Sequence, residues 1–115
     1  MRKFYILYYW TDYEGYDLYQ VYLGDNYQAA KARYKALHDY IYQKFFIDEG
    51  DDPESIEDNF RALPDDMDSG SSICSYMNNQ GDYYVTYGIK CITKHKFERA
   101  DMENWYKEHC PDAKN

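Results

Sequence analysis

The sequence predicts a single α+β domain, residues 1–115, with an antiparallel sheet from two hairpins, one long helix packed across it and two short helices. Three observations support this prediction. Aromatic and β-branched residues form two pairs of strand-like runs, one helical apolar stripe follows the first pair, and glycines and asparagines lie at the turns. The predicted order is ββα, short α, ββα. Apolar residues make up 44% of the chain, which favours one globular core over a disordered chain.

The first hairpin is predicted from an aromatic run at residues 4–10 and a second run at 18–23. A turn centred near residues 13–14 pairs three residues with three others: Phe4 with Leu23, Ile6 with Val21 and Tyr8 with Tyr19. It places Tyr5, Tyr9 and Tyr22 together on the second face. Neither face is clearly polar, so either both faces are covered or one is an open aromatic platform. We expect helices on one face and an incompletely covered, tyrosine-rich second face.

A long helix is predicted over residues 26–46. Either Asp25 or Asn26 can cap it, because both side chains accept hydrogen bonds from the first N–H groups. Apolar side chains recur at steps of three or four along one face: Tyr27, Ala30, Tyr34, Leu37, Ile41 and Phe45. His38 lies beside this stripe and is interpreted as a packed or surface side chain rather than a ligand. The stripe predicts that the helix packs on the hairpin.

Residues 48–68 form the one abrupt change in composition. They contain ten acids and one base, a net charge of −9, while the rest of the chain has a net charge of +1. Asp52 can cap a helix and Pro53 suits its first position, so a short helix is predicted over residues 53–63. Three apolar residues at helical spacing are expected to hold it on the domain: Ile56, Phe60 and Leu63. The acids then point outward.

A second hairpin is predicted from a strand at 71–77, a turn at 78–81 and a return strand that begins at Tyr83. Apolar residues alternate with others along the return strand, which indicates one buried face: Val85, Tyr87, Ile89 and Cys91. A final short helix is predicted over residues 102–109, ending before Pro111.

No catalytic or metal-binding motif rises above background, so no cofactor or metal is predicted. The chain holds three dispersed cysteines: Cys74, Cys91 and Cys110. An odd number without close spacing indicates reduced thiols in the cytoplasm rather than a disulfide framework or a zinc site. The acids that begin at Asp48 do not follow the spacing of an EF-hand. No stretch has the length of a membrane span. An enzyme that uses His95 or His109 is the least favoured interpretation.

Charge and tyrosine content are the features that bear on function. A pI near 4.7 disfavours direct binding of nucleic acid, because neutralisation of phosphates dominates such affinity. Carboxylates on a folded frame beside tyrosines instead resemble the surface of acidic inhibitors that occupy nucleic-acid-binding sites. This build is common among small phage antagonists of restriction or CRISPR effectors. The sequence therefore predicts a non-enzymatic module that binds a basic protein partner.

The predicted partner-binding residues are seven acids and three tyrosines: Asp48, Glu49, Asp51, Asp52, Glu54, Glu57, Asp58, Tyr5, Tyr9 and Tyr22. The alternative function is a pocket between sheet and helix that binds a small aromatic or nucleotide-like ligand. An acidic domain whose charge merely keeps it soluble accounts for the same composition.

Overall fold

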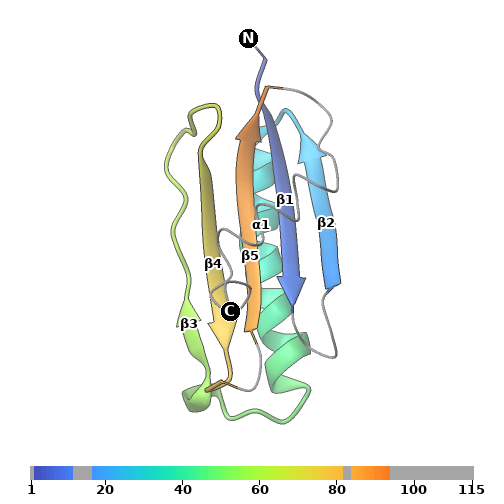
Figure 1. The fold of residues 1–115 in the computed structure, drawn as a ribbon, viewed down its shortest axis with the longest axis vertical. Coiled ribbons are helices and arrows are strands. Elements are labelled where there is room, and N and C mark those ends of the chain that lie inside the picture. The colour runs from blue at the N-terminus through green and yellow to red at the C-terminus, as the bar shows by residue number, and fades with distance from the viewer. Residues whose placement is uncertain (1, 12–16, 82–83, 94–115) are drawn as a thin grey trace.

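A computed structural model shows an α+β fold in which a five-stranded antiparallel sheet carries one 21-residue helix (Figure 1). The structure describes residues 2–11, 17–81 and 84–93. The strands are β1 (Phe4–Thr11), β2 (Asp17–Gly24), β3 (Glu57–Asn59), β4 (Ser72–Asn78) and β5 (Tyr84–Ile92). Their order in the sheet is β2-β1-β5-β4-β3. The predicted antiparallel sheet and its two hairpins are confirmed, and β3 is an additional strand.

The first hairpin has a different register from the predicted one. Ile6 lies opposite Leu23 and Tyr8 opposite Gln20, so Val21 is an extra residue on β2. Such a bulge moves the residues beyond it to the other face of the sheet. As a result Tyr19 lies opposite Tyr9, on the helix-covered face, and its predicted pairing with Tyr8 is wrong.

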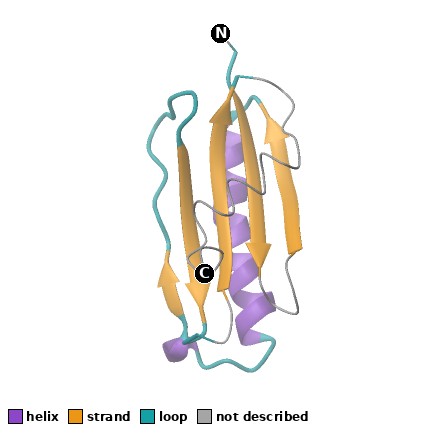
Figure 2. Ribbon diagram, viewed as in Figure 1, coloured by secondary structure: helices purple, strands orange, loops and turns teal. Residues whose placement is uncertain are grey.

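The long helix begins where the sequence predicts. Helix α1 (Tyr27–Ile41) is capped by Asn26, whose side-chain oxygen accepts a hydrogen bond from the Ala29 N–H at 3.0 Å. It continues directly into a π-helical segment, η1 (Tyr42–Ile47), and together they cover one side of the sheet (Figure 2). The predicted apolar stripe of α1 is buried: Tyr27, Ala30, Tyr34, Leu37 and Ile41.

The π-helical turn changes which phenylalanine enters the core. Phe46 is fully buried, whereas Phe45, the predicted member of the stripe, is half-buried. The Asp48 N–H donates to the Gln43 carbonyl five residues earlier, at 2.8 Å. Because a π-turn joins residues five apart instead of four, the next buried position moves one residue along the chain. Gly50 then ends the helical segment with a φ of 93°, a conformation that glycine adopts without strain.

The predicted helix over residues 53–63 is wrong. Only η2 (Pro53–Ser55) is helical, a short 3₁₀ turn capped by Asp52 as expected. The chain then extends into β3, which pairs with β4. A longer helix would place Glu54 four residues before Asp58, and such like-charge pairs destabilise a helix. Pairing with β4 instead provides partners for the backbone groups of both strands.

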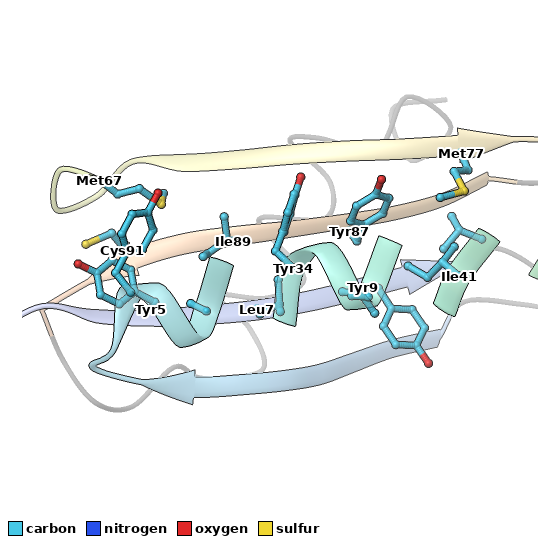
Figure 3. Close-up of a cluster of buried hydrophobic side chains, with 14 of the residues drawn as sticks. Tyr5, Leu7, Tyr9, Tyr34, Ile41, Met67, Met77, Tyr87, Ile89 and Cys91 are labelled. Atoms are coloured by element: carbon cyan, nitrogen blue, oxygen red, sulfur yellow. The ribbon is translucent and has the colours of Figure 1, made fainter. Parts of the chain in front are cut away.

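The central strands β1 and β5 are buried on both faces. On the helix side, their alternate residues form a core with α1 (Figure 3): Tyr5, Leu7, Tyr9, Val85, Tyr87, Ile89 and Cys91. On the opposite side Ile6, Tyr8 and Trp10 are also fully buried. The expected open, tyrosine-rich face is therefore wrong, because the face that carries Tyr5 and Tyr9 is the one that α1 covers. The expectation of a single buried face on β5 is also wrong, since Thr86 on its other face is buried.

The second hairpin, β4 and β5, forms as predicted. Asn78 pairs with Tyr84, and the side-chain oxygen of Asn78 accepts a hydrogen bond from the Gly81 N–H at 2.7 Å. The φ of Gly81 is 104°, which explains the glycine at this turn. The helix predicted over residues 102–109 lies outside the described residues.

Candidate functional site

The acidic segment, residues 48–68, crosses one end of the sheet and then lies along one of its edges. After η1 it passes through η2 and β3 and then follows the outer side of β4 (Figure 1). Nine of its ten acids are exposed, and Asp51 is half-buried. We term residues 48–68 the acidic edge. Its acids point outward as predicted, although they do so from an extended chain rather than from a helix.

Apolar contacts and hydrogen bonds hold the acidic edge against the domain. Three of its side chains pack on the core: Ile56, Leu63 and Met67. The Tyr27 hydroxyl donates to the Pro64 carbonyl at 2.7 Å. The Lys3 ammonium donates to the Met67 carbonyl at 2.9 Å. The carboxylates are therefore displayed on a fixed frame.

Few cations lie beside these carboxylates. Within the described residues, Lys3 pairs with Asp66 at 3.4 Å, and the imidazole of His38 lies 3.3 Å from the carboxylate of Asp58. The two other ion pairs of the described chain use acids outside the acidic edge. Among the described residues, most of the negative charge on this edge therefore has no cation paired with it and projects a field into solvent.

A buried histidine lies behind the acidic edge, which agrees with the interpretation of His38 as a packed or surface side chain. His38 bonds through Nδ1 to the Tyr87 hydroxyl, while its Nε2 faces Asp58. The partly exposed ring of Phe60 covers it, with ring centres 4.7 Å apart. Burial lowers the pKa of His38, and the carboxylate of Asp58 acts in the opposite direction. His38 is therefore mainly neutral at pH 7, so its contact with Asp58 is not a full ion pair.

Two buried phenols continue this polar cluster toward β4. The Tyr34 hydroxyl lies 2.5 Å from Ser75 Oγ, which also accepts the Arg61 N–H at 2.7 Å. Figure 3 shows the hydroxyls of Tyr34 and Tyr87 directed to the same side, toward β4. Burial is the main cause that raises the pKa of both phenols, so both remain protonated near neutral pH. The cluster therefore satisfies buried polar groups and does not supply an activated nucleophile.

The three tyrosines predicted as partner anchors do not lie beside the predicted acids on one surface. Tyr5 and Tyr9 are buried under α1. Tyr22 on β2 is half-buried, and its hydroxyl donates to the Asn26 carbonyl at 3.3 Å. Because β2 and β3 are the opposite edges of the sheet, three strands separate Tyr22 from the acids of β3.

A groove lies between α1 and β2, at the edge opposite to the acidic edge. We term it the aromatic groove; its volume is about 440 Å³, and its main lining residues are Tyr9, Tyr19, Val21, Arg33, Leu37 and Tyr40. The rings of Tyr9 and Tyr19 stack with centres 4.6 Å apart. In Figure 3 the Tyr9 hydroxyl points toward β2, away from the hydroxyls of Tyr34 and Tyr87. Sequence periodicity could not find this groove, because it depends on the bulge that turns Tyr19 toward the helix.

Comparison of the chain with protein-family models, curated proteins and solved structures finds no match. In the part of the chain that the structure describes, no three His, Cys, Asp or Glu side chains are placed to hold a metal ion. None of the described helices is long and apolar enough to cross a membrane. Cys74 and Cys91 carry thiols rather than a disulfide. Cys110, His95 and His109 lie outside the described residues.

Proposed function

We propose that the acidic edge binds a basic surface of another protein, and that the chain is a non-enzymatic inhibitor of a basic, nucleic-acid-handling effector of the restriction or CRISPR kind. The observation that carries this proposal is the exposure of nine of the ten acids of the acidic edge. Such a row offers negative charges where an effector would otherwise bind phosphates. The thiols of Cys74 and Cys91 are in keeping with a cytoplasmic site of action.

The fixed frame of the acidic edge supports this proposal. Ile56, Leu63 and Met67 already hold the segment on the core. Binding by this segment therefore requires less ordering of the chain than binding by a disordered acidic tail. Complementary charge also speeds the encounter of two proteins and disfavours wrong partners. Recognition by this edge is therefore expected to show a fast, salt-dependent association.

Some acids of the acidic edge have contacts within the fold, and others have none among the described residues. Asp52 caps η2, and the carboxylate of Asp58 lies 3.3 Å from the imidazole of His38. No side-chain hydrogen bond or ion pair within the described residues engages Asp51 or Glu54. Asp51 and Glu54 are therefore the sharper test positions. Tyr5 and Tyr9 are buried, so we assign no partner contact to their rings.

The test is a pull-down from the source cell followed by surface-based kinetics with the purified partner. Association is expected to slow with added salt, since the screening length falls from about 10 Å at 0.1 M to about 3 Å at 1 M. Asp51→Asn combined with Glu54→Gln should slow association at low salt. Asp17→Asn combined with Asp25→Asn removes the same charge at the β2 edge, opposite the acidic edge, and should change the rate much less. Nucleic acid bound by the partner should compete with the native chain.

Circular dichroism provides the folding control for both double variants. Unchanged association of the Asp51/Glu54 variant at low salt would show that the acidic edge is only a solubilising surface. Equal slowing by the two double variants would show that overall charge, and not this edge, governs the encounter.

A further inference from the structure

The aromatic groove exposes ring surface around a concavity. Its walls, Tyr19 and Tyr40, are 42% and 44% exposed, while its floor residue Leu37 is buried. Tyr9 connects the two walls, because its ring centre lies 4.6 Å from that of Tyr19 and 6.4 Å from that of Tyr40. Concave sites lined by aromatic and aliphatic side chains with a few polar groups are typical of small-molecule sites. The rings offer π faces on which a planar ligand can stack.

Two cations flank these rings. Arg33 lines the groove directly, with its guanidinium carbon 5.5 Å from the centre of the Tyr22 ring. The Lys44 ammonium donates to the Tyr40 hydroxyl at 2.8 Å, and this hydrogen bond raises the pKa of Lys44. Among the described residues, neither Arg33 nor Lys44 forms an ion pair with a carboxylate. Arg33 and Lys44 therefore contribute positive charge at the groove, opposite in sign to the net charge of −8 of the whole chain.

The size of the groove limits what it can hold. A volume of about 440 Å³ lies in the lower half of the range of roughly 300–1,000 Å³ that is common for small-molecule sites. It suits one bicyclic ring with a short substituent rather than a long peptide. Because guanidinium and carboxylate or phosphate form paired hydrogen bonds, Arg33 is suited to bind the substituent when it is an anion.

We propose that the aromatic groove binds a small planar aromatic anion, whose ring stacks between Tyr19 and Tyr40 and whose anionic group contacts Arg33. A purine nucleotide and an aryl carboxylate share this chemistry. The site is independent of the proposed inhibitor function, because it lies at the opposite edge of the sheet from the acids of β3.

The test is an NMR titration of the ¹⁵N-labelled chain with two pairs of probes. Adenosine 5′-monophosphate is compared with adenosine, and indole-3-acetate with indole-3-acetamide. We expect saturable shifts at amides around Tyr19, Val21 and Tyr40, with dissociation constants of about 0.1–1 mM for an open site of this size. The charged member of each pair should bind about two- to fivefold more tightly than the neutral one, as expected for an exposed ion pair. The tighter charged probe then identifies the nucleotide or the carboxylate as the ligand class.

Matched variants distinguish a direct contact between Arg33 and the anionic group from the effect of the overall charge of the protein. Arg33→Gln should abolish the preference for the charged probe, whereas Lys35→Gln removes the same charge from a side chain placed over Phe60 and should retain it. Retention of the native amide spectrum confirms that each variant folds. The proposal is overturned if no probe gives saturable shifts, if the shifts lie outside the groove, or if Arg33→Gln keeps the charge preference.

Discussion

The two edges of the sheet use charge and aromatic rings in opposite ways. At the acidic edge the carboxylates are exposed and the phenol hydroxyls of Tyr34 and Tyr87 are buried behind them. At the β2 edge the rings of Tyr19 and Tyr40 are exposed, and the charged residue that lines the groove is a cation, Arg33. Helix α1 lies between the two edges and contributes side chains to both, Tyr34 and His38 to one and Arg33 and Tyr40 to the other.

This difference follows from the range of the two interactions. A charge acts over about 10 Å at ordinary salt, so it needs only a fixed position and access to solvent. A ring stabilises a ligand by contacts of about 3.5–4.0 Å, so it needs an open concave surface. Helix α1 can therefore support the acidic edge from behind and line the aromatic groove at the β2 edge. Variants in the shared core and at each edge test that division.

Truncation of Phe46 should have the largest effect. Phe46→Ala empties a fully buried site in the shared frame and is expected to reduce the free energy of unfolding by about 3–5 kcal/mol. Phe45→Ala should cost clearly less, because the Phe45 ring is half-buried and packs edge-on against Tyr9 on the groove side. Chemical denaturation of the two variants measures the difference. A larger loss for Phe45→Ala would contradict the π-helical assignment of this turn.

Loss of a buried hydroxyl behind the acidic edge should have a moderate effect. Tyr34→Phe removes the partner of Ser75 and is expected to cost about 0.5–1.5 kcal/mol of stability. The matched change at the other edge, Tyr40→Phe, alters an exposed hydroxyl and should stay within about 0.5 kcal/mol of the native value. Denaturation curves for both variants decide the comparison. Equal losses would show that the two edges do not differ in how they bury their phenols.

The pH dependence of stability should report the burial of His38. Its pKa is lowered below the ordinary 6.5, so the unfolded chain binds more protons than the folded one once the pH falls below about 6.5. The contribution of His38 is therefore present above that pH and decreases as the pH falls through the folded-state pKa.

The measurement is the free energy of unfolding of the native chain minus that of His38→Gln, followed from pH 8 to pH 5 by denaturation. Titration of the carboxylates occurs in both proteins and largely cancels in the difference. The difference is expected to shrink toward acid pH. A difference that does not vary with pH would show that His38 keeps its ordinary pKa in the folded protein.

The smallest effect on stability is expected at the carboxylates of the acidic edge that have no side-chain partner among the described residues. Asp51→Asn combined with Glu54→Gln should change the free energy of unfolding by no more than about 0.5 kcal/mol, because neither side chain has a partner among the described contacts. The same variant is the one expected to slow association with a basic partner. A large loss of stability would mean that these carboxylates support the fold, and the binding test would then need other acids.

The local pattern of residues in the sequence was enough to predict several elements of the fold. The Asn26 cap and the stripe from Tyr27 to Ile41 follow from side-chain chemistry and a 3.6-residue period. The hairpin strands and the outward position of the acids were predicted in the same way. These properties depend on neighbours within a few residues, and the sequence displays such neighbours directly.

Contacts between segments that are distant in the sequence determined the features that the sequence did not predict. Residues 57–59 pair with the edge of β4 and form β3 in place of a helix. The bulge at Val21 sets the register of β2 that forms the aromatic groove. The expected open tyrosine face was wrong for the same reason. His38 entered a polar cluster only because the fold brought it to Tyr87, 49 residues away in the chain. Periodicity carries no information on which strand edge, bulge or partner a residue meets, because those contacts exist only after the sheet and helix have packed together.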